Sequence, residues 1–212
     1  MKRLAILAAL VAATAPALAA NPVTLTFEGV GDYGTSVNEF YNGGTSGAGS
    51  TGTNHGVSFT SSMLSLTNDA LGSYFSNAPS GGTVAFVFGE TAYVNVDAGF
   101  SGYLSLYYSS SAMLNNSINI YSGLNGTGDL LASLSLNANA TAGCSDTAFC
   151  NWEKTSAVFA GVGKSISFAD ANSVVAFDNV TLAPVPEPST YALLAGGLGM
   201  VAFVARRRRN IG

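Results

Sequence analysis

Alternation of apolar and polar residues with a period of two constrains the fold of this chain more than any other feature. Side chains of a β-strand point to opposite faces in turn, so this pattern marks strands with one buried face. No stretch between Val23 and Leu182 carries the spacing of an amphipathic helix. The alternation recurs in about ten short segments, namely 23–27, 57–59, 64–66, 84–88, 92–96, 104–108, 118–120, 132–136, 166–168 and 175–182.

Turn-forming residues separate these segments, for example at 42–44, 80–82 and 125–126, where asparagine, serine and glycine cluster. Glycine and asparagine tolerate the left-handed backbone that tight turns require. Many short strands divided by such turns predict an all-β domain, built as a two-sheet antiparallel sandwich of jelly-roll type.

The first 19 residues have the order of a secretory signal peptide. Lys2 and Arg3 form a positively charged start, and residues 4–13 are an unbroken apolar run. Ala17 and Ala19 then place small residues where signal peptidase cleaves. Because the apolar run is too short to span a bilayer stably, we predict that residues 1–19 are removed and that the protein is exported across the inner membrane.

The C-terminal segment, residues 184–212, has a different character. Its prolines favour an extended backbone, and all fifteen residues from Tyr191 to Ala205 are apolar or glycine. A helix of that length reaches about 22 Å, against a hydrocarbon core of about 30 Å. We predict a single hydrophobic helix that anchors the chain in the inner membrane. The membrane stop that holds its end in the cytoplasm is Arg206, Arg207, Arg208 and Arg209.

This tail resembles the PEP-CTERM sorting signal of exported proteins from Gram-negative bacteria that make exopolysaccharide. The resemblance rests on the apolar helix with a Gly-Gly pair, the arginine cluster, and the motif Pro186, Glu187 and Pro188. It implies that an exosortase, a membrane cysteine peptidase, cleaves near the motif, so that anchoring is transient. It also implies a final place at the cell surface or outside the cell, with exopolysaccharide as a partner. The alternative is a permanent tail anchor.

Between the two ends we predict one β-sandwich domain, residues 20–183. Two cations stand against twelve acids between Ala20 and Pro188, a net charge of −10. Such a surface repels phosphate backbones, so we expect no binding of nucleic acid. The acids suit either divalent cations or plain solubility.

Cys144 and Cys150 are the two cysteines of the chain. An exported protein folds in an oxidising compartment, which predicts a disulfide between them. Two thiolates without nearby histidines do not suggest a metal site.

The domain itself is similar to carbohydrate-binding-module jelly rolls in residues 25–28, 121–128 and 176–182. Those modules often hold a structural calcium, which implies the same cofactor here, with Glu28 and Asp178 as candidate ligands from neighbouring strands. Calcium takes 6 to 8 oxygen ligands, and carboxylates are common among them. Asp97 is a third candidate. The alternative is that these acids face solvent or cap turns.

Sugar-binding candidates are the aromatic residues Trp152, Tyr33 and Tyr41, because aromatic rings supply stacking platforms. Tyr74, Phe75 and Tyr108 are further candidates of the same kind. The alternative for each is a place in the core, and Trp152 could pack over the disulfide. His55 is the only histidine, and no Gly-x-Ser-x-Gly elbow accompanies it.

Three functions are consistent with the sequence. The first is a non-enzymatic surface or extracellular-matrix protein associated with exopolysaccharide. The second is a carbohydrate-binding module with a defined sugar site. The third is a small secreted hydrolase, which needs a pair of carboxylates about 5 to 10 Å apart in a cleft. We expect a protein that is not an enzyme.

Overall fold

Nine strands and long loops make up residues 21–185 of the computed structural model, which describes residues 21–185 and 196–201. Asn21–Val185 is one compact unit. The predicted signal peptide, the Pro-Glu-Pro motif and the four arginines lie outside the described residues. The strands are β1 (Val23–Leu25), β2 (Val57–Phe59), β3 (Met63–Thr67), β4 (Thr83–Val87), β5 (Ala92–Ser110), β6 (Leu114–Tyr121), β7 (Leu130–Leu136), β8 (Glu153–Phe168) and β9 (Val175–Pro184).

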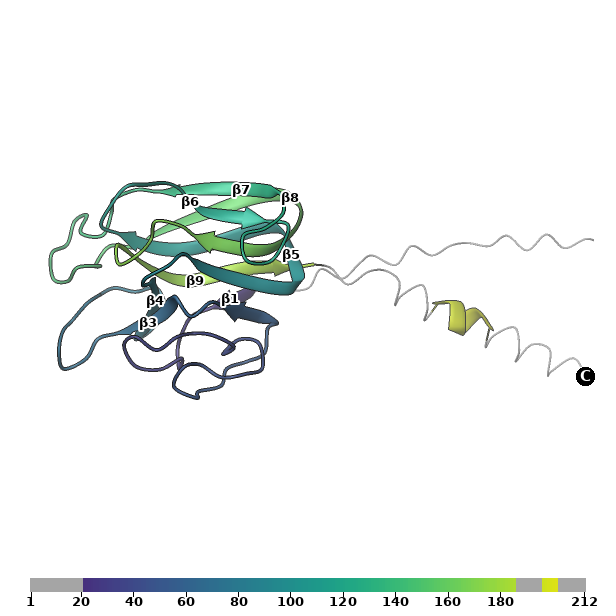
Figure 1. The fold of residues 1–212 in the computed structure, drawn as a ribbon, viewed down its shortest axis with the longest axis horizontal. Helices are drawn as coiled ribbons and strands as arrows, with labels where there is room; N and C mark the ends of the chain where they lie inside the picture. The colour runs from purple at the N-terminus through teal and green to yellow at the C-terminus, as the bar shows by residue number, and fades with distance from the viewer. Residues whose placement is uncertain (1–20, 186–195, 202–212) are drawn as a thin grey trace, which may run out of the picture. The chain divides into compact units, whose positions relative to one another are not determined.

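All strand pairs are antiparallel. The pairing runs β3-β4-β9-β5-β8-β6-β7, with β1 added on β9 and β2 on β5 (Figure 1). The strands therefore form one continuous hydrogen-bonded sheet.

Two long strands, β5 and β8, divide this sheet into two layers. Residues 92–96 of β5 pair with residues 165–168 of β8. On the outer sides of this pair, β2 is bonded to β5 and β6 is bonded to β8, and β7 follows β6. This group is the first layer. Residues 103–110 of β5 lie between β9 and residues 153–158 of β8. β9 also pairs with β1 and with β4, and β4 pairs with β3. This group is the second layer, and it lies on the other side of the molecule from β6 and β7 in Figure 1.

Irregular residues let β5 and β8 pass from one layer to the other. The register of β5 against β8 shifts between Asn95 and Phe100 and again between Ser101 and Tyr103. Gly99 and Gly102 adopt φ angles of 80° and 75° there, a left-handed backbone that glycine takes without a steric penalty. Bulges of this kind bend a strand and increase its twist.

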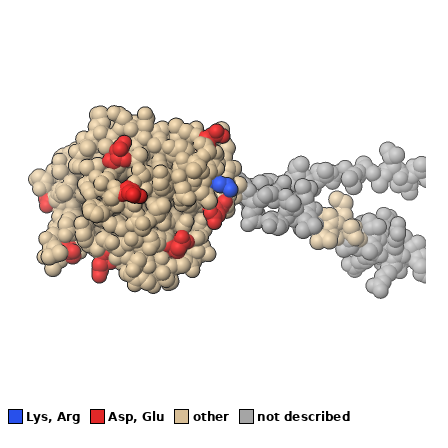
Figure 2. Space-filling model, viewed as in Figure 1, with Lys and Arg blue, Asp and Glu red and all other residues tan. Residues whose placement is uncertain are grey.

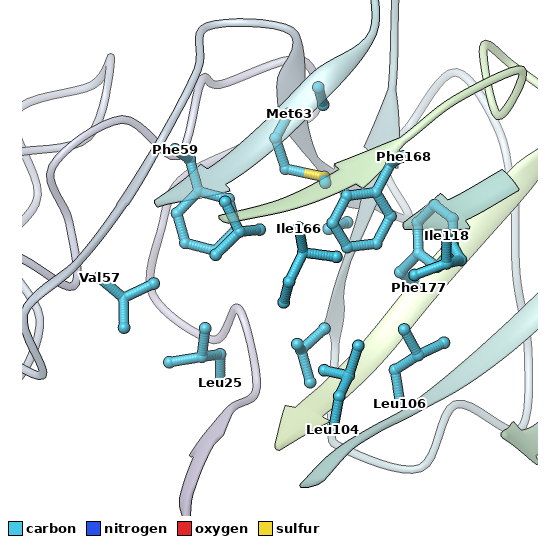
Figure 3. Close-up of a cluster of buried hydrophobic side chains, with 14 of the residues drawn as sticks. Leu25, Val57, Phe59, Met63, Leu104, Leu106, Ile118, Ile166, Phe168 and Phe177 are labelled. Atoms are coloured by element: carbon cyan, nitrogen blue, oxygen red, sulfur yellow. The ribbon is translucent and has the colours of Figure 1, made fainter. Parts of the chain in front are cut away.

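The main core lies between the layers, and Figure 3 shows part of it. Phe168 from the first layer and Phe177 from the second are both fully buried, and their rings meet edge to face at 4.8 Å. The predicted all-β antiparallel sandwich is confirmed, with the added detail that hydrogen bonds through β5 and β8 join its two layers.

The second layer is covered on its outer face as well. Every residue of β4 is buried, although the alternating pattern predicted one exposed face. Ala85 and Val87 face the main core, whereas Val84 and Phe86 belong to a smaller cluster with Phe75. The loop that carries Phe75 folds over this face, which explains the extra burial.

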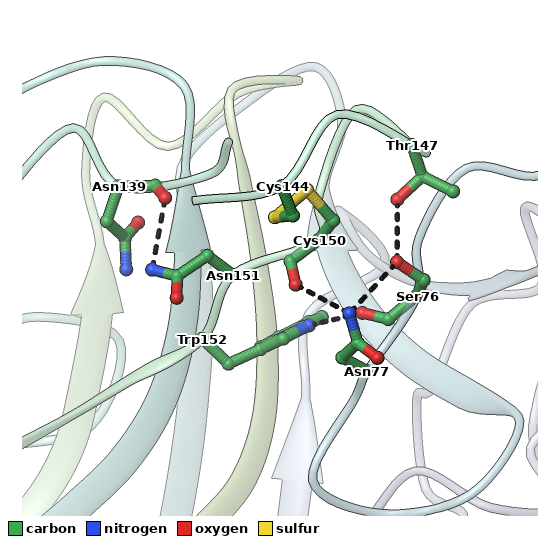
Figure 4. The surroundings of a disulfide bond; sticks show 8 residues. All are labelled: Ser76, Asn77, Asn139, Cys144, Thr147, Cys150, Asn151 and Trp152. Atoms are coloured by element: carbon green, nitrogen blue, oxygen red, sulfur yellow. Dashed lines mark hydrogen bonds between the residues drawn. A yellow bond between two sulfur atoms is a disulfide. The ribbon is translucent and has the colours of Figure 1, made fainter. Parts of the chain in front are cut away.

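The predicted disulfide is present, and Figure 4 shows its surroundings. Cys144 and Cys150 are joined, with Cα atoms 6.1 Å apart. Trp152 Nε1 donates to the carbonyl oxygen of Ser76 at 2.9 Å, and Asn77 Nδ2 donates to that of Cys150 at 3.1 Å. The disulfide loop and the loop of Phe75 are thereby held together.

In the C-terminal segment the described residues 196–201 are helical. Among the residues that the structure describes, no helix has the length and apolar character required to cross a bilayer. The other residues of the predicted hydrophobic helix, 191–195 and 202–205, fall outside this description.

Candidate functional site

Strand pairing brings the two predicted calcium ligands to one end of the domain. β1 and β9 are neighbours, with Leu25 opposite Val180, so Glu28 follows the end of β1 close to Asp178 on β9. Two residues beside these acids, Phe27 and Asn179, have left-handed φ angles of 64° and 48°. A bulky residue such as Phe27 rarely adopts this backbone, and such conformations concentrate at functional sites.

The loop between β3 and β4 closes over both carboxylates. Asp178 is fully buried, and its two oxygens accept hydrogen bonds from Ser80 N, Ser80 Oγ and Asn179 N. Glu28 is exposed, and its Oε1 accepts a hydrogen bond from Thr83 N at 2.9 Å. None of these donors is cationic, so both acids are hydrogen-bonded without being neutralised.

The electrostatics of the site reflect this uncompensated charge. The pKa of Asp178 is raised to about 6, mainly by burial and to a smaller extent by the negative charge of Glu28, against the lowering effect of the Ser80 and Asn179 hydrogen bonds. Burial also raises the pKa of Tyr41 to about 12, with smaller contributions from Glu28 and Asp178. A cation beside the two carboxylates would favour their charged forms.

The donor set fits a hard divalent cation such as calcium. Glu28 and Asp178 offer carboxylate oxygens, and the carbonyl oxygen of Thr26 lies 3.1 Å from Ser80 Oγ in the same group. Calcium prefers oxygen ligands of this kind, and water completes its shell where the protein supplies few. The trio Cys144, Asp146 and Cys150 also clusters, but its sulfur atoms are bonded to each other and do not serve as thiolate ligands.

A cavity of about 530 Å³ lies beside Glu28. Its lining includes Tyr41, whose ring stacks on that of His55 with ring centres 6.2 Å apart. Its walls carry mostly small polar residues, and the lining includes Thr24, Thr26, Glu28, Thr51, Thr53 and His55. A polar molecule or ion can reach Glu28 from this cavity.

A second, apolar site follows from the two-residue period of β4. Val84 and Phe86 point to the outer face of the second layer, and Phe88, two residues further, is 61% exposed. Phe88 lies with Tyr33, Tyr74 and Phe86 along a cavity of about 160 Å³. We call this group the aromatic cleft.

Three rings of the aromatic cleft are stacked, and the fourth, Phe88, meets Phe86 edge to face at 6.5 Å. Tyr33 lies over Tyr74 at 5.0 Å with 22° between the ring planes, and over Phe86 at 5.7 Å with 18°. Tyr33 is 48% exposed. A concave apolar surface with polar groups at its rim is typical of ligand-binding sites.

The predicted sugar-binding aromatics lie in three different surroundings. Tyr33 belongs to the aromatic cleft. Trp152 is half-buried and packs edge to face on Phe75, and Tyr41 is buried with its hydroxyl accepting from Phe27 N. Phe86 and Phe88 were missed. The signal that could have identified them is the apolar run of β4, which has no polar face to turn to solvent.

Acidic side chains are dispersed over the surface of the domain. Figure 2 shows them singly on a largely uncharged face. The two cations of the described chain are Lys154 and Lys164, both on β8. The charged side chains on the described surface are therefore predominantly acidic.

Comparison with known proteins identifies the C-terminal segment. Residues 184–209 match the PEP-CTERM protein-sorting motif. The tail is therefore a sorting motif of that class, which points to export and to a surface or extracellular location. No curated protein matches the chain.

Among solved structures the chain is similar to a family 6 carbohydrate-binding module and to the K2 cleaved adhesin domain of Lys-gingipain. The first has 18% identity and a TM-score of 0.39, over 60% of this chain and 87% of that one. The second has 14% identity and a TM-score of 0.46, over 77% of this chain and 99% of that one. A glycoside hydrolase family 43 arabinoxylan arabinofuranohydrolase from Bacillus subtilis has 14% identity and a TM-score of 0.37, over 58% of this chain and 24% of that one. Similarity at this level carries no information on ligand or activity.

Proposed function

We propose that this chain is a non-enzymatic surface protein whose β-sandwich binds exopolysaccharide through the aromatic cleft. The observation that carries the proposal is the stacked, half-exposed ring of Tyr33 above Tyr74 and Phe86. An exported protein gains nothing in stability from leaving such rings in water, whereas a sugar ring can cover them.

The route to the surface forms part of the same proposal. Signal peptidase removes residues 1–19, and the hydrophobic helix of the tail then holds the chain in the inner membrane. An exosortase recognises the Pro-Glu-Pro motif and releases the domain to the cell surface or the extracellular matrix. The match of residues 184–209 to the sorting motif supports this sequence of events.

A binding role accounts for the acidic site better than a hydrolytic role does. Three hydrogen bonds from Ser80 and Asn179 hold the Asp178 carboxylate in place under the loop. Such a carboxylate serves to organise the loop between β3 and β4. With a divalent cation it would also connect β1 and β9 to this loop. We propose that this cation is calcium.

Substitution of Tyr33 tests the binding site. Tyr33→Ala is expected to weaken binding to the exopolysaccharide of the producing bacterium by about tenfold, which corresponds to ~1.4 kcal/mol of lost contact energy. Affinity electrophoresis in gels that contain the polysaccharide measures the change. Tyr121→Ala is the matched control, because Tyr121 is a partly exposed tyrosine on β6 in the first layer. Equal retardation of wild type and Tyr33→Ala would remove the aromatic cleft as the site.

Processing of the tail has its own test. Intact-mass measurement of protein from the native host is expected to show a mature form without Arg206–Arg209. Replacing Pro186 and Pro188 by alanine should leave the unprocessed chain in the membrane fraction. Recovery of only the full-length C-terminus from the wild type would instead indicate a permanent anchor.

A further inference from the structure

The cavity of the aromatic cleft is lined by no charged side chain. Three members of its lining are buried, and none of them has a polar side-chain atom: Leu66, Phe86 and Val175. The hydroxyl groups of the lining belong to Tyr33, Tyr74 and Ser173. The cleft therefore offers hydrocarbon surface to the enclosed part of a ligand and only a few hydroxyl groups to the rest of it.

This lining determines which part of a sugar can be enclosed. Ser173 Oγ already donates its hydrogen bond to Asn172 Oδ1 at 3.1 Å. A sugar hydroxyl that is buried without a partner loses its bonds to water, whereas a buried methyl group gains from leaving water. A sugar that presents a methyl group to Leu66 and Phe86 is therefore favoured over one that presents a hydroxyl group there.

The charges beside the cleft are negative. Asp32 directly precedes Tyr33. Partial burial and, to a smaller extent, the negative charge of Asp69 raise the pKa of Tyr74. The hydrogen bonds that Asp69 Oδ1 accepts come from two backbone N–H groups, which are not cationic. The two lysines of the described chain lie on β8 and are not among the lining residues. Since like charges repel, a sugar that carries a carboxylate is disfavoured.

We propose that the aromatic cleft selects neutral sugars that carry a methyl group, supplied by a 6-deoxyhexose or by an O-acetyl substituent, and excludes uronic acids. This inference rests on the proposed binding of polysaccharide at the same cleft and names the class of sugar. The exposed ring of Tyr33 stacks on the C–H face of the sugar. The methyl group contacts the buried hydrocarbon surface of Leu66 and Phe86.

Matched sugars test the preference for a methyl group, with the full chain purified in mild detergent. L-Fucose and L-galactose differ only in that the first has a methyl group where the second has a hydroxymethyl group, and L-rhamnose and L-mannose differ in the same way. Each sugar is coupled to albumin as a multivalent probe. A change of this size in an apolar pocket alters affinity by about tenfold or more. In at least one pair the deoxy sugar is therefore expected to bind about tenfold more tightly.

Acetylated glucomannan, before and after mild alkali removes its acetyl groups, tests the other source of methyl groups. Loss of binding after alkali identifies the O-acetyl substituent, and a preference within the deoxy pairs identifies the 6-deoxyhexose. Equal or tighter binding of the hydroxylated partner in both pairs, together with no effect of alkali, overturns the proposal.

Ala148→Lys tests the exclusion of uronic acids. Ala148 is exposed and lines the cavity of the cleft, so a lysine there adds a cation at its rim. The wild type is expected not to bind albumin that carries D-glucuronic acid. The variant should bind this probe at low salt at least about fivefold better, the upper range for an exposed ion pair.

Ala142→Lys is the matched control, because Ala142 is also exposed but does not line this cavity. It adds the same charge to the protein and should leave binding of the glucuronic acid probe unchanged. Strong binding of this probe by the wild type, or an equal gain in the two variants, overturns the proposed exclusion.

Failure of this inference is distinguishable from failure of the proposed function. If the exopolysaccharide of the producing bacterium retards the wild type but not Tyr33→Ala, while no methyl-bearing probe binds, the cleft is a sugar site and the preference for methyl groups is wrong. If neither the exopolysaccharide nor any probe binds the wild type, both proposals are wrong.

Discussion

Adding millimolar Ca²⁺ to the chelated protein is expected to raise its melting temperature by about 5 to 10 °C. A ligand that binds only the folded state stabilises it by RT ln(1 + [L]/Kd), about 2.7 kcal/mol at a hundredfold excess over Kd. For a domain of this size 1 kcal/mol shifts the midpoint by about 2 to 4 °C. The ligands we expect are Glu28 and Asp178, whose strands β1 and β9 are neighbours. Differential scanning calorimetry with Ca²⁺ and with chelator makes the comparison.

The effect of calcium should depend on pH through Asp178. The pKa of this carboxyl group is about 6 in the folded chain, above its ordinary value of 3.8. In chelated protein its contribution to stability is therefore fully present below pH 3.8 and is lost as the pH rises through about 6. Calcium requires the charged form, so its stabilising effect should be larger at pH 7.5 than at pH 5.

Two variants separate calcium binding from general charge effects. Glu28→Gln keeps an oxygen that can accept from Thr83 N but removes a charged ligand, so it should abolish most of the temperature rise. Glu90→Gln removes an exposed acid after β4 and should leave the rise unchanged. An identical melting temperature with calcium and with chelator would show that the two acids organise the loop without a metal.

Phe168→Ala is expected to lower the free energy of unfolding by about 3 to 5 kcal/mol. Truncating a buried phenylalanine loses its transfer free energy and leaves a cavity, and a typical domain has only about 5 to 15 kcal/mol in total. Phe168 is fully buried and meets Phe177 of the other layer edge to face. The loss should therefore weaken the contact between the layers, which urea denaturation measures.

Phe88→Ala is the matched control for this prediction. Phe88 is 61% exposed, so its removal should change the free energy of unfolding by less than about 0.5 kcal/mol. A loss below 1 kcal/mol for Phe168→Ala would mean that the space between the layers collapses readily around the smaller side chain.

Much of the fold could be predicted from local patterns. Alternation identified the segments of nearly all strands, because the two faces of a half-buried strand meet different surroundings. Residues 97–103 of β5 and 153–165 of β8 escaped prediction as strand. Glycines at Gly99, Gly102 and Gly161 interrupt the pattern there, yet they are what allows β5 and β8 to bend between layers.

The candidate sites divide in the same way. The disulfide between Cys144 and Cys150 follows from two cysteines and an oxidising compartment. Glu28 and Asp178 could be named because they belong with the first and last alternating segments, which a jelly roll of the kind that the sequence resembles commonly brings side by side. The aromatic cleft could not, because Tyr33, Tyr74 and Phe86 come from three separate segments and only packing brings their rings together.

By itself the sequence determined the sorting motif and the class of fold. The predicted signal peptide, the sorting motif and the alternation are all local patterns, since each depends on residues close together along the chain. The tertiary structure decided which surfaces are available to partners. Tyr41 is buried and Tyr33 is exposed, and a loop covers β3 whereas β7 ends the strand order. These differences depend on contacts between residues far apart in the chain, which no local pattern records.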